Sequence, residues 1–263
     1  MKFSQLNRDN VQQYLWANGD PSALWIFQHI PKTAGSSLTV ELRKNRPPYR
    51  NFFADFSSSV GPRDQMRALA ETADLAPSKK PLRSASGHFF ASEMDVLLKR
   101  YPDARLFTFV RDPIERVVSS YRYSRTPDHP QWEKMLLDYP DIETFIDRSP
   151  IARNETAFFM LGVRTGNAQE VASAALERFN FIGCLEKYPA SFRALSSMLW
   201  RRSDPEVRVR VTHATEHNRV ELSESIRAQI ERKNYLDLEI YKQVMNKLTV
   251  IERALEAPPG NYS

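Results

Sequence analysis

Short apolar segments separated by longer amphipathic ones recur along the 263 residues of the chain. The apolar segments are typical of buried strands, and the stretches between them have the spacing of helices with one buried face. This alternation predicts an α/β fold in which helices flank a central, mostly parallel sheet in three layers. The segments expected to form strands are residues 24–30, 83–87, 105–110, 179–184 and 207–212.

The two ends of the chain have patterns of their own, although we expect residues 1–263 to form a single domain. Residues 1–20 predict a polar arm that is anchored by Tyr14, Leu15 and Trp16. Apolar residues at helical spacing predict a pair of helices over residues 223–254, with the apolar stripe packed into the core. The last residues, 256–263, are expected to form a frayed tail.

The segment 24–44 has the layout of a phosphate-binding loop. An apolar strand is followed by a loop, residues 31–35, and then by a helix. The N-terminus of a helix binds anions through its main-chain N–H groups and its dipole. In nucleotide kinases the pattern is GxxxxGK[ST], with the lysine after the glycines, whereas here Lys32 precedes Gly35. The motif therefore indicates an anion site without identifying the anion.

A second strand-to-helix unit follows at residues 104–125. Arg111 is expected at the carboxyl end of the strand, with Asp112 as the helix cap. Ser119 lies two turns into the predicted helix, so the Arg111 guanidinium and the Ser119 hydroxyl could bind one phosphate. An equally good explanation of these residues is an ion pair between Arg111 and Asp112 that only stabilises the start of the helix. Ligands of open α/β sheets lie at the carboxyl ends of the strands, so two such sites suggest a nucleotide with a second phosphate on its ribose.

Composition excludes several classes of function. The net charge of +5 favours anionic ligands, but the chain lacks the dense basic stripe of a nucleic-acid binder. One cysteine, Cys184, and five scattered histidines do not predict a disulfide or a metal site. The chain has neither a signal-peptide pattern nor the roughly 18 consecutive apolar residues of a membrane span. We therefore expect a cytoplasmic protein without a membrane span, a nucleic-acid partner or a metal.

Together the two motifs resemble those of the sulfotransferases that use PAPS (3′-phosphoadenosine-5′-phosphosulfate). The likeness is to the carbohydrate branch, which includes heparan sulfate 2-O-sulfotransferase. HIPKTAGSSL, residues 29–38, is similar to the family's 5′-phosphosulfate loop, and RDPIERVVSSY, residues 111–121, to its 3′-phosphate motif. SGHFF, residues 86–90, resembles the segment that supplies the family's catalytic base. Weaker likenesses at 154–162, 181–195 and 236–244 extend the resemblance over roughly residues 22 to 250.

The resemblance implies a P-loop-type fold and an enzyme that moves a sulfuryl group from PAPS to an acceptor hydroxyl. It implies PAP as the product, a carbohydrate as the acceptor and no metal. Lys32 would neutralise charge on the leaving phosphate, and His88 would take the proton of the acceptor alcohol. Asn154 and Glu155 would contact the acceptor. The residues implied to bind the donor are Lys32, Thr33, Ala34, Gly35, Ser36, Ser37, Leu38, Arg111 and Ser119.

Two alternatives remain open from the sequence. A P-loop phosphotransferase that uses ATP would share the strand-loop-helix layout but not the order of lysine and glycine. A protein that binds a nucleotide without catalysis would need neither Lys32 nor His88. Basic residues after the first helix also leave two interpretations, attraction of an anionic glycan or a solvated surface. They are Arg43, Lys44, Arg46 and Arg50, with Arg122 and Arg125 further along the chain.

Overall fold

A computed structural model describes residues 1–20, 22–33, 35–76, 81–199 and 220–256. Its centre is one five-stranded sheet in the order β2-β3-β1-β4-β5, and all four neighbouring pairs run parallel. The predicted α/β fold with a parallel sheet is confirmed. The strands are β1 (Trp25–Gln28), β2 (Tyr49–Phe52), β3 (Ser84–Gly87), β4 (Arg105–Val110) and β5 (Phe181–Cys184).

Strand β2 was absent from the prediction made on apolar pattern. Its sequence is YRNF, and only Phe52 is buried because β2 lies at the edge of the sheet, beyond β3. An edge strand has one neighbour and needs no continuous apolar run. The strand expected at residues 207–212 lies outside the described residues.

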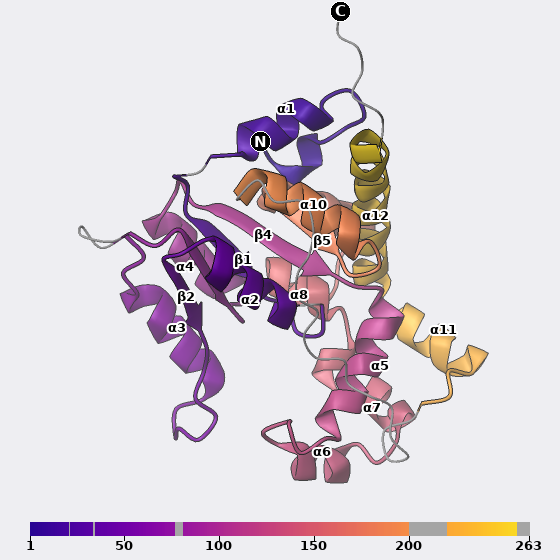
Figure 1. Ribbon diagram of the computed structural model, residues 1–263. Coiled ribbons are helices and arrows are strands. Elements are labelled where there is room, and N and C mark those ends of the chain that lie inside the picture. The colour runs from indigo at the N-terminus through magenta and orange to yellow at the C-terminus, as the bar shows by residue number, and fades with distance from the viewer. Residues whose placement is uncertain (21, 34, 77–80, 200–219, 257–263) are drawn as a thin grey trace, which may run out of the picture.

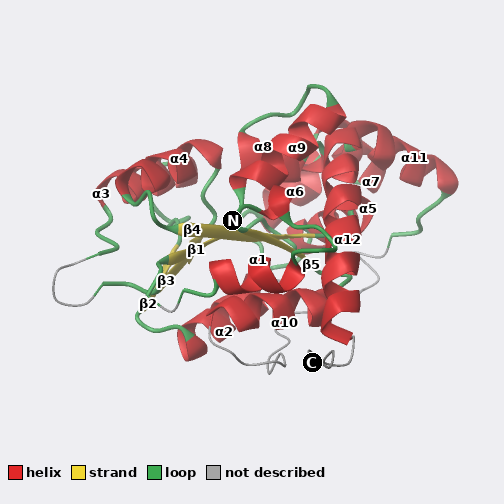
Figure 2. Cartoon of the chain, turned by 90° about the horizontal axis from the view of Figure 1, so that it is seen from above, coloured by secondary structure: helices red, strands yellow, loops and turns green. Residues whose placement is uncertain are grey.

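Helices cover both faces of the sheet and make three layers (Figure 2). On one side lie α1 (Val11–Asn18), α2 (Gly35–Asn45) and α10 (Tyr188–Leu199). On the other side lie α3 (Pro62–Thr72), α4 (Ala91–Arg100), α8 (Glu155–Leu161) and α9 (Ala168–Arg178). The long helix α12 (Tyr235–Glu256) packs against α9, α10 and β5.

A further group of helices lies beyond the carboxyl end of β4 (Figure 1). It consists of α5 (Pro113–Ser124), α6 (Trp132–Asp138), α7 (Ile142–Arg148), the 3-10 turn Pro150–Ala152 and α11 (Glu224–Lys233). Apolar side chains of α5, α7 and α11 form a separate buried cluster that includes Val117, Phe145 and Ile230. This cluster fixes the orientation of α5, the helix that follows the second anion motif.

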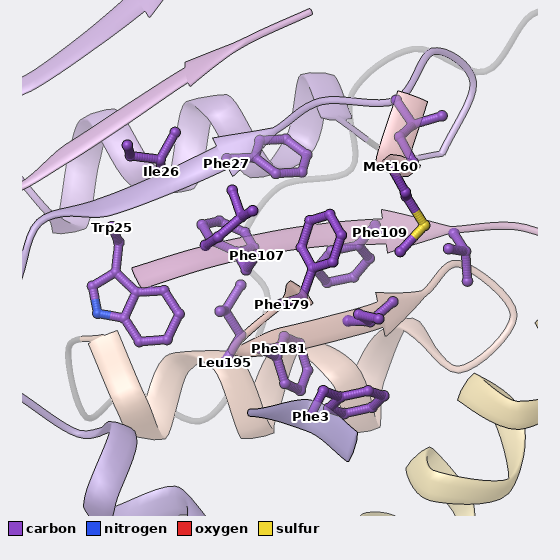
Figure 3. Close-up of a cluster of buried hydrophobic side chains, with 14 of the residues drawn as sticks. Phe3, Trp25, Ile26, Phe27, Phe107, Phe109, Met160, Phe179, Phe181 and Leu195 are labelled. Atoms are coloured by element: carbon purple, nitrogen blue, oxygen red, sulfur yellow. The ribbon is translucent and has the colours of Figure 1, made fainter. Parts of the chain in front are cut away.

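The main core is rich in aromatic rings from the strands (Figure 3). Trp25, Phe27 and Phe107 are all 0% exposed, and the rings of Phe27 and Phe107 stack across β1 and β4 at 4.9 Å. Strands that are buried on both faces consist of nearly continuous apolar residues, which is why β1 and β4 could be predicted from the sequence. Because β1 and β4 are buried and packed together, they fix the positions of the loops that follow them.

The N-terminal segment is more ordered than the predicted polar arm. A 3-10 turn, Phe3–Gln5, precedes α1, and Phe3 and Tyr14 are fully buried. Trp16, expected to be part of the anchor, is 84% exposed because it lies on the outer face of α1. At the other end, the predicted helix pair corresponds to α11 and α12, whose stripe Leu236 to Ile251 is buried as expected. Residues 257–263 of the predicted tail lie outside the described residues.

No helix in the described part of the chain is both long enough and apolar enough to cross a membrane.

Candidate active site

Three sequence motifs meet at the carboxyl edge of the sheet. Lys32 follows β1, His88 follows β3 and Arg111 follows β4. Strand β1 lies between β3 and β4, and Gln28 is level with Gly87 in the parallel register. The tertiary structure therefore brings together side chains that are far apart in sequence, as the order of parallel strands requires.

The first loop is braced by its own residues. Thr33 is fully buried, and its hydroxyl donates to the main-chain oxygen of Ile30 at 2.8 Å. Lys32 has a left-handed backbone with φ of 70°, which is uncommon for a residue with a side chain. Such conformations occur at sites where the surroundings hold the chain. Ala34 lies outside the described residues, and the helix α2 begins at Gly35.

Side chains of the second motif hold Lys32 at both ends. Arg111 donates through Nη1 to the main-chain oxygen of Lys32 at 3.4 Å. The ammonium Nζ of Lys32 lies 4.2 Å from the centroid of the Tyr123 ring, a cation–π geometry. Tyr123 lies on α5, four residues after Ser119, so both side chains share one face of that helix. The ring was not expected to have this role, although its spacing from Ser119 was visible in the sequence.

The N-terminus of α5 is closed by Asp112. The Asp112 carboxylate accepts from the main-chain N–H groups of Ile114 and Glu115 at 2.9 and 3.0 Å. The predicted Asp112 cap is confirmed, and these N–H groups are already satisfied. A phosphate at this motif must therefore rely on side chains. Arg111 is 21% exposed and faces Glu115 at 3.5 Å, and Ser119 is half-buried on the same helix.

His88 has a defined proton position. Its Nδ1 lies 2.7 Å from the main-chain oxygen of His29. A carbonyl oxygen can only accept, so in this hydrogen bond Nδ1 carries the proton and Nε2 of the neutral ring keeps a lone pair. The His88 side chain is exposed to solvent at the sheet edge, yet surrounding protein lowers its pKa by desolvation. The His88 ring is thus neutral near neutral pH, and its basic nitrogen is Nε2, which is not the atom bonded to the His29 oxygen.

Comparison with protein-family models shows which family the chain belongs to. The model described as "Sulfotransferase family" matches residues 20–242 of the chain. The chain belongs to the sulfotransferase family. The matched range contains Lys32, His88 and Arg111, and all five strands of the sheet.

A search of curated proteins found no match. Among solved structures, the chain is similar to the crystal structure of mouse sulfotransferase SULT7A1 complexed with PAP. The two are 16% identical over 88% of this chain and 69% of that chain, with a TM-score of 0.36.

Asn154 and Glu155 belong to a buried polar network of the sulfotransferase. Asn154 is 1% exposed, and its side chain donates to Arg164 O at 2.9 Å and accepts from Leu236 N at 3.1 Å. Glu155 pairs with Arg164 at 2.5 Å, although burial raises its pKa. Asn154 joins the start of α8 to the start of α12, and Glu155 joins α8 to Arg164. Both residues are therefore left out of the site proposed below.

Arg116 lies on α5 with Ser119, and it is not a solvated helix charge. Its side chain is 1% exposed and lies 4.0 Å from the buried carboxylate of Asp237 on α12. Arg116 also donates to the main-chain oxygen of Ile151 at 3.1 Å. Asp237 in turn accepts from the N–H groups of Thr156 and Ala157, both at 2.9 Å. The helical spacing of Arg116 was visible, but its burial depends on α12, which comes much later in the chain.

Of the basic residues in question, Arg43 and Lys44 lie within α2 and Arg46 directly follows it. Helix α2 begins at the site and runs through 11 residues, about 16 Å at the usual rise, so Arg43 and Lys44 lie at its far end. Arg46 is 5% exposed and donates to the main-chain oxygens of Asp20 and Ala23 at 3.1 and 2.7 Å. Arg46 is therefore a buried structural residue rather than a surface for an anionic glycan.

Two other carboxylates, those of Glu93 and Glu155, already have partners within the protein. The carboxylate of Glu93 accepts from the main-chain N–H of Phe90 at 3.0 Å and so caps α4. Glu155 is occupied by Arg164, as described above. In the described part of the chain no group of three or more His, Cys, Asp and Glu side chains is placed to hold a metal ion.

Proposed function

We propose that this sulfotransferase uses PAPS as the sulfuryl donor and an alcohol as the acceptor. The observation that carries the proposal is the meeting of Lys32, His88 and Arg111 at the ends of three parallel strands. These groups supply a cation, a base and a guanidinium at one edge of the sheet. Membership in the sulfotransferase family supports sulfuryl transfer as the reaction.

The donor site divides between the two motifs. The N-terminus of α2, from Gly35 to Leu38, is suited to the 5′-phosphate, because main-chain N–H groups and the helix dipole attract anions there. Arg111 and Ser119 would bind the ribose 3′-phosphate through side chains, because Asp112 already caps α5. The guanidinium is suited to a phosphate because it donates two parallel hydrogen bonds.

The reaction needs charge neutralisation and removal of one proton. PAPS supplies the sulfuryl group: the acceptor oxygen forms a bond to sulfur as the bond to the bridging oxygen breaks, and PAP leaves with the electron pair. Lys32 places a positive charge where negative charge develops. His88 takes the acceptor proton at Nε2, since Nδ1 already carries its own proton toward His29.

A substitution at His88 tests this assignment. The His88→Ala variant should bind PAP normally and lose about 10² to 10⁴ of the turnover rate, the usual effect of removing a general base. Glu93→Gln is the matched control, because glutamine also accepts at a helix cap and should preserve both stability and turnover. A His88→Ala variant with wild-type turnover on the best acceptor would mean that the base lies elsewhere.

The two alternatives are separated by ligand binding and transfer assays. Calorimetric titration with PAP, ATP and GTP, followed by transfer of radiolabelled sulfate, distinguishes the three functions. Binding of PAP with sulfate transfer supports the proposal. Preference for ATP would indicate a phosphotransferase, and PAP binding without transfer to any acceptor would indicate a binding protein.

We further propose that the acceptor is a carbohydrate, as the resemblance to the carbohydrate branch suggests. Transfer assays with a neutral glycan, an anionic glycan and a small alcohol would rank the acceptors. An anionic acceptor would also show a Michaelis constant that rises with salt, because exposed charges are screened over about 8 Å at physiological ionic strength. The cytoplasmic location expected from the sequence stays a prediction.

A further inference from the structure

A column of stacked rings connects the hydrophobic core to His88. Phe107 stacks on Phe27 with centroids 4.9 Å apart and planes at 15°, and both rings are visible side by side in Figure 3. Phe27 stacks on His29 at 5.3 Å and 17°. His29 stacks on His88 at 4.1 Å and 30°. His29 is therefore the link between a fully buried aromatic pair and the exposed ring of His88.

His29 contacts His88 in a second way. Its main-chain oxygen accepts from Nδ1 of His88 at 2.7 Å, while its own main-chain N–H donates to the oxygen of Gly87 at 2.9 Å. The stack limits the tilt of the His88 ring, and the hydrogen bond limits its rotation. Both degrees of freedom must be restricted for Nε2 to point in one direction.

The outer edge of the His29 ring lies against Gly35, in the phosphate-binding segment. A Cβ atom placed on Gly35 would fall 1.6 Å from Nε2 and 2.0 Å from Cδ2 of His29. The imidazole thus occupies the space of the missing side chain at the first residue of α2. This close approach, rather than an unusual backbone angle, explains why position 35 is glycine.

We propose that His29 is a positioning residue that sets the orientation of the His88 ring and the distance between that ring and Gly35. Its imidazole is the common spacer between the base and the phosphate-binding loop. The inference rests on the proposed function for its catalytic meaning, but the geometry can be tested without turnover. In support, burial and the neighbouring charges of His88 and Lys32 lower the pKa of His29 well below its ordinary value. His29 therefore stays neutral when His88 gains a proton.

The first test compares His29→Phe, which keeps a flat ring in the column, with His29→Ala, which removes it. Nitrogen-15 spectra of labelled histidine report the tautomer of His88. We expect the Nδ1–H form to predominate in the wild type and in His29→Phe. We expect a mixture in His29→Ala, which keeps the main-chain oxygen but lets the unsupported His88 ring tilt away from it. With acceptor, kcat of His29→Ala should fall by up to about 10²-fold, as misplacement of a catalytic group by about 1 Å can cost. The affinity for PAP should change much less, and His29→Phe should restore most of kcat.

The second test uses the contact with Gly35. Gly35→Ala should lower the melting temperature and the affinity for PAP, since its methyl group collides with the His29 ring. The double variant His29→Ala with Gly35→Ala should recover stability relative to Gly35→Ala alone. Additive losses in the double variant would overturn the spacer role.

The outcomes separate this inference from the proposed function. If His29→Ala leaves both the His88 tautomer and kcat at wild-type values, the positioning role is wrong even though sulfuryl transfer stands. If the wild type transfers no sulfate, the proposed function fails. The tautomer spectra and the double variant would then still decide whether His29 positions His88 and Gly35.

Discussion

The ammonium group of Lys32 lies 4.2 Å from the centroid of the Tyr123 ring, so a helix of the second anion motif holds the lysine of the first. Arg111, from the same second motif, donates to the main-chain oxygen of Lys32 at 3.4 Å. The two motifs are therefore in direct contact at the edge of the sheet. Substitutions in the second motif should therefore change the position of Lys32 in the first.

Tyr123 should influence turnover through Lys32. A cation–π contact contributes about 0.5–1 kcal/mol at an exposed site, so Tyr123→Leu should lower kcat roughly two- to fivefold. Tyr123→Phe keeps the ring face and should retain most of the activity, although it loses the hydrogen bond from the hydroxyl to Asp128 O. Steady-state kinetics on both variants checks this. Equal losses in the two would assign the effect to the hydroxyl instead.

Lys32 should matter more for the rate than for binding. The Lys32→Ala variant should lose about 10² to 10³ of kcat, because the lysine stabilises charge that develops in the transition state. Calorimetry should show a smaller change in the affinity for PAP. Lys44→Ala, at the exposed far end of α2, is the matched control and should behave like the wild type. Unchanged turnover in Lys32→Ala would remove the lysine from the mechanism.

Arg111 should determine the preference for a 3′-phosphate. The wild type should bind PAP more tightly than AMP, and Arg111→Ala should remove roughly 1.5–3 kcal/mol of that preference, the contribution of a hydrogen bond to a charged group. Glu115→Gln should increase the preference for PAP over AMP, because the Glu115 carboxylate lies 3.5 Å from the Arg111 guanidinium and competes with the phosphate for it. Titrations with PAP and AMP give both results. An unchanged ratio of the two affinities in Arg111→Ala would place the 3′-phosphate elsewhere.

The rate should fall in acid with the titration of His88. Its pKa is lowered from the ordinary 6.5, mainly by desolvation, while the hydrogen bond to His29 O opposes the shift. The neutral ring is the base, so a lowered pKa keeps the enzyme active to lower pH. The acid limb of the kcat profile should therefore lie below pH 6.5 in the wild type and be absent from the residual activity of His88→Ala. An acid limb above that value would contradict the assignment.

The ion pair of Arg116 with Asp237 should stabilise the fold rather than bind the nucleotide. Removing one partner of a buried pair costs about 3–5 kcal/mol, so Arg116→Met should lower the free energy of unfolding by that amount. Arg67→Met is the control, because Arg67 is 71% exposed and pairs with Glu71 on the surface of α3. Denaturant unfolding measures both. A stable Arg116→Met protein that no longer binds PAP would instead make Arg116 a nucleotide ligand.

Local pattern in the sequence determined four of the strands, the terminal helix pair and the cap at Asp112. Strands buried on both faces are apolar throughout, and a helix with one buried face repeats its apolar residues, so both signals lie within a few neighbouring positions. The same locality placed Lys32, His88 and Arg111 directly after strands. Because the carboxyl ends of parallel strands share one edge, the sequence also indicated that these three residues would meet.

Only the tertiary structure decided what each polar residue contacts. Arg116 is buried because Asp237 on α12 comes to meet it, and Asn154 caps the same helix from a distant part of the chain. His29 lies between His88 and Gly35, two contacts that depend on how β1, β3 and α2 pack. Burial and pairing are properties of partners that are remote in sequence, so a pattern read along the chain predicts where a side chain emerges but not what it faces.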